Sequence, residues 1–182
     1  MRKRWGLTLI EMIIAVALLA TLTGTIIAKY NDFGKIQTAT AVWNRMQQVF
    51  KEAKTNALSG KKDCAVCGGA DGTCNEESDS RLLGWRVNIN PGGVNGYSIE
   101  GLCNNPADPT SPFTFMQRTE VFPDNATISV ITAGPIPVDV NILFKPLNGG
   151  TNRTSNLNLR VTDASGNYNS ILVDTDGEVT AN

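Results

Sequence analysis

A run of 22 residues, Leu7 to Ala28, is almost entirely apolar and follows three nearby cations, Arg2, Lys3 and Arg4. A helix of this length rises about 33 Å, which is enough to cross the roughly 30 Å hydrocarbon core of a bilayer. Cations on one flank of a span keep that flank in the cytoplasm. The run therefore predicts a single-pass anchor, with the C-terminal part of the chain on the extracytoplasmic side.

A cleaved export signal is the alternative interpretation of this run. Signal peptides carry an apolar stretch of about 7 to 15 residues, followed by a cleavage site of small residues. The run is longer than that, and the nearest downstream A-x-A motif, Ala39 to Ala41, lies well beyond its end. The sequence therefore favours an anchor that stays attached.

Glu11 stands at the fifth position of the apolar run. By analogy with other charges, a carboxylate within the bilayer costs about 2.5 to 3.5 kcal/mol. A buried carboxylate becomes neutral or finds a partner. A Glu close to the membrane edge can instead extend to the lipid headgroups. Both explanations are open at this point.

The stretch G-L-T-L-I-E, Gly6 to Glu11, resembles the type IV prepilin signature. In that family a prepilin peptidase cuts after the Gly and N-methylates the new first residue, and a carboxylate follows at the fifth mature position. The resemblance implies that residues 1–6 are a leader, that Gly6 and Leu7 form the cleavage site, and that Leu7 is methylated. Leu7 stands where the family most often has Phe. Glu11 would then pair with the amine of Leu7, its own or a neighbour's, and set the register of subunits during assembly.

The helical pattern continues beyond the apolar run, and no Pro occurs from Leu7 to Leu58. Gly60 follows and favours a helix end. We expect residues 7–28 to be the transmembrane and assembly half of one long helix and residues 29–58 to be its amphipathic half. Apolar side chains recur at three- and four-residue steps on one face of this second half, at Ile36, Ala39, Val42, Trp43, Met46, Val49, Phe50, Ala53 and Ala57.

Residues 59–182 differ in composition, with Gly, Asn, Asp, Ser and Thr between short β-patterned runs. Strands without intervening helices indicate antiparallel pairing. The predicted fold class is α+β, with a long N-terminal helix packed on an antiparallel β-sheet or β-sandwich in an extracytoplasmic head. Strands are expected at 81–89, 96–100, 113–117, 127–132, 138–144, 157–161 and 169–173, followed by a turn at 174–179 into a last strand.

The end of the chain resembles the GspH/FimT family of pseudopilins and minor pilins. Phe144 to Gly149 reads F-K-P-L-N-G, similar to an F-x-P-x-G stretch of that family, and Asp176-Gly177 stands at its closing turn. Together the resemblances imply a structural subunit, a minor pilin or pseudopilin, of a type IV pilus (a fimbrium) or a type II secretion pseudopilus. The implied location is the inner membrane and then the filament. The implied partners are prepilin peptidase, other pilin or pseudopilin subunits and the assembly platform.

Four cysteines occur in the head. Thiols outside the cytoplasm tend to oxidise, so an even number of cysteines predicts two disulfides. Of the three possible connectivities, a Cys64–Cys67 bridge would close a very tight ring, which leaves Cys64–Cys74 with Cys67–Cys103 or Cys64–Cys103 with Cys67–Cys74. A zinc site with four thiolate ligands is the alternative, although the C-x6-C spacing is less regular than paired C-x2-C.

Catalysis has no obvious residues to use in this chain. There is no His, and the sequence contains no G-x-S-x-G, P-loop or G-x-G-x-x-G motif. We expect no enzyme activity and no cofactor. The net charge of −1, which becomes more negative without the leader, gives no general attraction to nucleic acid. Two further functions remain as alternatives, namely a DNA-uptake or adhesive minor pilin that binds an extracellular ligand, and a membrane-tethered domain with a four-cysteine zinc site.

Overall fold

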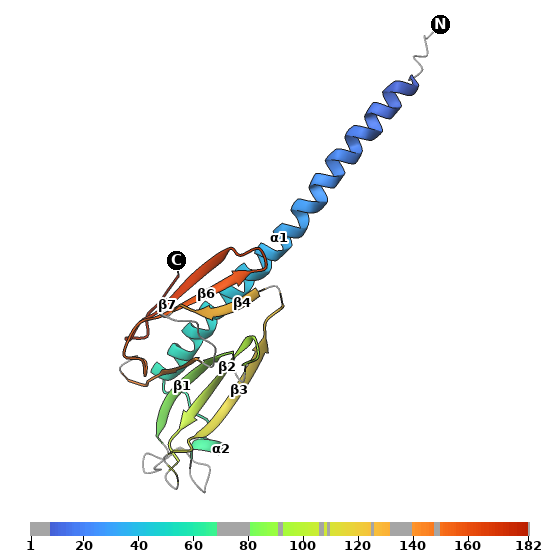
Figure 1. Ribbon diagram of the computed structural model, residues 1–182. Coiled ribbons are helices and arrows are strands. Elements are labelled where there is room, and N and C mark those ends of the chain that lie inside the picture. The colour runs from blue at the N-terminus through green and yellow to red at the C-terminus, as the bar shows by residue number, and fades with distance from the viewer. Residues whose placement is uncertain are drawn as a thin grey trace.

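The computed structural model consists of one long helix that projects from a two-sheet head (Figure 1). The first half of the helix extends away from the head, and the second half lies against both sheets. The structure describes residues 8–68, 81–90, 93–105, 108, 110–124, 126–131, 140–147 and 150–181. The predicted α+β class, with a helix packed on antiparallel sheets, is confirmed.

Helix α1, Leu9–Leu58, is 50 residues long and has no break. It ends where the sequence predicts, because Gly60 adopts a left-handed conformation with φ of 64°. The N–H of Gly60 donates to Ala57 O (3.2 Å), and the N–H of Lys61 donates to Asn56 O (3.0 Å). These two bonds satisfy carbonyls of the last turn that have no partner within the helix.

Within the described residues, eight strands form two four-stranded sheets in which every pair is antiparallel. The first sheet has the order β3-β2-β1-β5 and the second has the order β4-β6-β7-β8. The strands are β1 (Leu82–Ile89), β2 (Gly96–Cys103), β3 (Phe113–Val121), β4 (Ala126–Val130), β5 (Val140–Phe144), β6 (Leu157–Asp163), β7 (Tyr168–Val173) and β8 (Val179–Ala181).

The two sheets cover successive parts of the same helix. The sheet with β6 and β7 lies nearer the projecting half of α1, and the sheet with β1 and β2 lies beyond it (Figure 1). Both turn their apolar faces to the helix, because buried residues alternate along the strands, as in Trp85, Val87 and Ile89 of β1. Side-chain amides join the sheets, since Asn90 donates to Ile128 O (3.2 Å) and Asn95 donates to Ala126 O (2.7 Å).

The second half of α1 supplies the centre of the core. Met46, Val49, Phe50, Ala53 and Ala57 are fully buried. Trp43 is partly buried against the core, and its indole N–H donates to Ser170 O (3.3 Å). The predicted apolar face is therefore the packed face, except that Ile36 is 45% exposed. Ile36 lies on the N-terminal side of the part that the sheets cover.

Several features of the head differ from the prediction. Strand β2 extends to Cys103, three residues further than predicted, and β6 extends to Asp163, two residues further. Strand β3 extends to Val121, four residues further than predicted, and a register shift interrupts its pairing with β2 between Ile99 and Gly101. A short helix, α2 (Cys64–Cys67), was not predicted. Asp63 caps α2, because its Oδ1 accepts the N–H of Ala65 at 3.0 Å.

Candidate assembly site

The N-terminal end of α1 is held by a reciprocal pair of side chains. Thr8 is the N-cap residue, and both its N–H and its hydroxyl donate to Oε2 of Glu11 at 3.1 Å. The N–H of Glu11 in turn donates to Oγ1 of Thr8 at 3.4 Å. This arrangement is a capping box, which satisfies two backbone donors that a helix start leaves without partners. Glu11 therefore has a structural role within its own chain.

The predicted cleavage residues, Gly6 and Leu7, lie outside the described residues. The amine that Glu11 is expected to meet would belong to Leu7, next to the N-cap residue. The capping box holds the carboxylate of Glu11 against the amide of Thr8. Pairing of Glu11 with an N-terminal amine stays a prediction.

The first half of α1 has exposed apolar side chains around its circumference. No other described part of the chain covers them, and each is more than half exposed: Leu9, Ile10, Met12, Ile13, Ile14, Val16, Leu18, Leu19, Leu22 and Ile26. A helix that is apolar all round is stable in lipid or among other helices. Within the described residues, no helix combines the length and the apolar character of a membrane-spanning segment. The single-pass span over residues 7–28 therefore stays a prediction.

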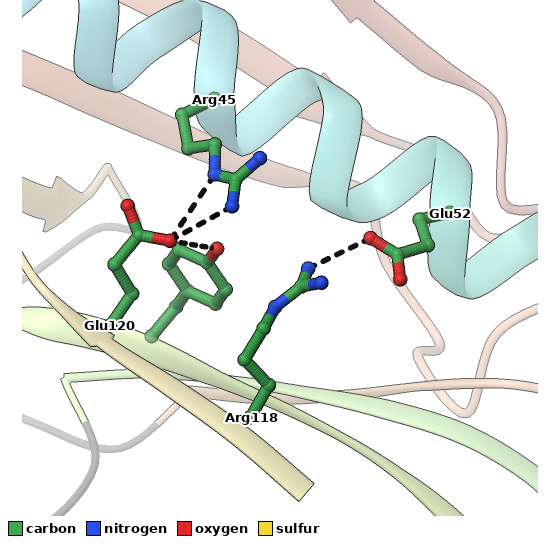
Figure 2. A network of polar contacts seen from close by, with 5 residues as sticks. Arg45, Glu52, Arg118 and Glu120 are labelled. Atoms are coloured by element: carbon green, nitrogen blue, oxygen red, sulfur yellow. Dashed lines mark hydrogen bonds and ion pairs between the residues drawn. The ribbon is translucent and has the colours of Figure 1, made fainter. Parts of the chain in front are cut away.

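Two ion pairs fix the head on the second half of α1 (Figure 2). The guanidinium of Arg45 donates to Oε2 of Glu120 on β3 through Nε (3.2 Å) and Nη2 (3.1 Å). About two helical turns further along α1, Arg118 of β3 donates to Oε2 of Glu52 (2.8 Å). The two pairs have opposite polarity across the interface, since the helix supplies one cation and one anion. Opposite charges meet only when Glu120 lies beside Arg45 and Arg118 lies beside Glu52. The two pairs therefore favour one register of β3 along the helix.

Tyr97 of β2 completes the first of these pairs. Its hydroxyl donates to the same Oε2 of Glu120 at 2.6 Å, while its ring is buried against Phe122. The hydrogen bond from Tyr97 lowers the pKa of Glu120, and Arg45 adds to the effect. Burial raises the pKa of Tyr97. Glu120 is thus held as a carboxylate, and one of its oxygens accepts three hydrogen bonds. This arrangement stabilises the contact between the helix and the sheet.

A disulfide joins Cys67 of α2 to Cys103 at the end of β2, with the two Cα atoms 5.7 Å apart. Both cysteines are buried, so the bridge fastens the segment after α1 to the first sheet. Cys64 is also disulfide-bonded, and Cys74 lies outside the described residues. Because the bridge uses two of the four thiolates, it contradicts the alternative of a four-cysteine zinc site.

Metal ligands do not gather elsewhere in the described ranges, where no group of three His, Cys, Asp or Glu side chains is placed to hold an ion. The turn at Asp174 is a local structure, because Oδ1 of Asp174 accepts the N–H groups of Asp176 (3.0 Å) and Glu178 (2.7 Å). Gly177 completes this turn with φ of 74°.

The contact between Thr8 and Glu11 was not predicted, although the sequence contains a signal for it. Thr8 to Glu11 reads T-x-x-E before an apolar run, which is the pattern of a capping box. No sequence signal indicated the network of Arg45, Tyr97 and Glu120, since the three residues come from elements far apart in the chain.

The comparisons with known proteins concern the N-terminal segment. Residues 1–27 match the model of the prokaryotic N-terminal methylation motif. The match supports a type IV pilin-like protein that is a substrate of prepilin peptidase, either pilin or pseudopilin, and it implies processing and assembly with other pilins. Searches of curated proteins and of solved structures gave no match.

Proposed function

We propose that this chain is a minor pilin or pseudopilin, of GspH/FimT type, in a type IV pilus or a type II secretion pseudopilus. Its role is mechanical assembly, without turnover of a substrate. In this proposal residues 7–28 cross the inner membrane once, and the head waits on the extracytoplasmic side until the subunit enters a filament. Its further partners are the prepilin peptidase and the assembly platform.

One observation carries the proposal, namely that a single helix has two different environments. The apolar side chains on one face between Ala39 and Ala57 are buried in the head, whereas the large apolar side chains described between Leu9 and Ile26 are exposed. A helix of 50 residues, about 75 Å long, is more than the head needs for its own core. The exposed half is therefore available to lipid first and to neighbouring helices afterwards.

Processing tests this proposal directly. Co-expression with a prepilin peptidase is expected to remove residues 1–6 and to leave N-methyl-Leu7, as measured by intact mass and N-terminal sequencing. A bulky residue in place of Gly6 should block the cut. As a matched control, the same substitution at Gly34, in the described helix and with open space around it, should leave the cut intact. An uncut chain, or a cut near Ala28, would refute the proposal.

A further inference from the structure

One face of α1 continues from the apolar half onto the head. Lys29, Phe33, Ile36 and Thr40 are spaced by four, three and four residues, so they lie on one side of the helix. Phe33 is 56% exposed, and Ile36 is 45% exposed. This side of the helix thus carries apolar groups into the region just beyond the predicted membrane boundary.

The turn between β6 and β7 meets the same side of the helix. A groove of about 320 Å³ lies between the two, with Ile36 and Thr40 on one wall and Asn167 and Tyr168 on the other. Figure 1 shows this end of the β6–β7 hairpin where the helix leaves the head. Tyr168 is 56% exposed there. The hairpin therefore places a second exposed aromatic ring beside the helix face.

A cation is stacked on that ring. The guanidinium carbon of Arg160 lies 3.8 Å from the centroid of the Tyr168 ring. Asp163, an acid that also lines the groove, is 6% exposed, and its carboxylate accepts N–H groups of the hairpin from Ser165 (2.8 Å) and Asn167 (2.9 Å). Among the side chains that the structure describes on this face, the charges less buried than Asp163 are the cations Lys29 and Arg160.

Aromatic rings beside cations are typical of the layer between lipid and water. Tyr gathers at headgroup level, and Arg or Lys can reach phosphates from there. Each such cation near an anionic surface contributes about 1 kcal/mol. We propose that, before it enters a filament, the head rests on the bilayer through a lipid-facing surface made of Lys29, Phe33, Ile36, Arg160 and Tyr168. The inference rests on the proposed function, in which residues 7–28 span the membrane.

The depth of this surface requires a tilted helix. Ile36 is eight residues beyond Ala28, or about 12 Å along the axis, whereas the headgroup layer is roughly 5 to 8 Å deep on each side. An upright helix would hold Tyr168 above that layer. Spanning helices tilt by about 20° on average, within a range of about 0 to 40°. A tilt toward the hairpin lowers Tyr168 and Arg160 to the phosphates, so the surface also defines the direction of the tilt.

Fluorescence quenching in vesicles tests the contact with the full chain. The vesicles contain phosphatidylcholine and phosphatidylglycerol, and a nitroxide on the lipid headgroup quenches nearby tryptophans. The chain has three native tryptophans, so the quenching of each variant is taken relative to the wild-type chain, and the added tryptophan of Tyr168→Trp reports on the proposed surface. Phe113→Trp is the matched control, because Phe113 pairs with Cys103 at the start of β3 and is 38% exposed. We expect strong quenching for Tyr168→Trp and little for Phe113→Trp. Adding Arg160→Gln to the first variant should reduce its quenching.

A third variant separates this inference from the proposed function. Leu18→Trp places a tryptophan in the middle of the apolar half, where brominated acyl chains should quench it. If Leu18→Trp is quenched but Tyr168→Trp is quenched no more than Phe113→Trp, the lipid-facing surface is refuted and the membrane span stands. If Leu18→Trp is not quenched, the membrane span itself is wrong, and the inference falls with it.

Discussion

The guanidinium of Arg45 on α1 lies 3.1 Å from the carboxylate of Glu120 on β3. Both side chains are about two-fifths exposed, at 41% and 42%, so water screens the attraction. An exposed pair of this kind contributes at most about 1 kcal/mol. We therefore expect the hydrogen bond from the buried Tyr97, the third member of the network, to contribute more to the free energy of unfolding than the ion pair alone.

Loss of the Tyr97 hydroxyl is the first prediction. Tyr97→Phe removes a donor to a charged acceptor inside the interface, and the free energy of unfolding should fall by about 1 to 2 kcal/mol. Glu52→Gln is the matched control, because it weakens the exposed Arg118–Glu52 pair while the Tyr97 hydroxyl stays in place, and it should cost less than about 1 kcal/mol. Urea unfolding of both variants gives the comparison. Equal effects would contradict the weight assigned to Tyr97.

The same network predicts how stability depends on pH. The pKa of Glu120 is lowered in the folded state, so the unfolded state takes up the proton first and stability is lost as the pH falls below about 4.5. The pKa of Tyr97 is raised, so the unfolded state releases the proton first and stability is lost as the pH rises above about 10.

Two variants separate these arms of the profile. Glu120→Gln should reduce the loss on the acid side, and Tyr97→Phe should reduce the loss on the alkaline side, each relative to the wild-type slope. The measurement is the urea midpoint across the pH range. Parallel profiles for wild type and both variants would show that the network does not titrate with folding.

The disulfide gives the third prediction. The Cys67–Cys103 bridge closes a segment with a sequence separation of 36 residues, and its removal by the double substitution Cys67→Ala and Cys103→Ala should cost about 2 to 4 kcal/mol. Peptide mapping of the oxidised chain should find this bridge and no free thiol. Cys64 is also bridged, and the sequence has four cysteines, so the mapping is expected to find a second bridge, Cys64–Cys74. Four titratable thiols, or a bound zinc, would contradict the result.

Glu11 gives the fourth prediction, and the capping box changes its design. Glu11→Ala removes both the cap and the charge, whereas Glu11→Gln keeps a side chain that can cap. If the charge sets subunit register, both variants should reach normal membrane levels while incorporation into filaments falls, most strongly for Ala. Sheared filaments compared with a membrane fraction measure this. Normal incorporation of Glu11→Gln with a defect in Glu11→Ala would assign the role of Glu11 to capping alone.

The helix could be predicted because its signals are local. The three- and four-residue spacing around Phe50 and the Gly at position 60 depend only on neighbours in the sequence. The end of β3 could not be predicted in this way. Arg118 and Glu120 face the helix and pair with charges on it. Because these inward-facing positions are charged, the sequence of this part of β3 resembles a polar loop and lacks the apolar alternation that predicts a strand. The backbone at Met116, with φ of 52°, also interrupts the alternation there.

The cysteine pairing needed distances that the sequence does not contain. The spacing of the cysteines argued against a Cys64–Cys67 bridge but left two connectivities open. The positions of α2 and of the end of β2 in the fold bring Cys67 to Cys103. For the assembly site, the sequence predicted the importance of Glu11 by resemblance to a family. The role of Thr8 as the N-cap residue was not predicted, although the T-x-x-E pattern of a capping box is present in the sequence.

The unbroken helix has a mechanical consequence. A force applied near Thr8 travels along α1 and reaches the head through side-chain contacts along the helix, and at its far end through the chain that leads from Leu58 to the Cys67–Cys103 bridge. Pulling along the axis therefore loads both sheets in shear at the same time. Arg45–Glu120 and Glu52–Arg118 act as lateral ties at two levels of that interface. In a filament under tension, the head would resist sliding as one body, and its strands would not be unzipped one after another.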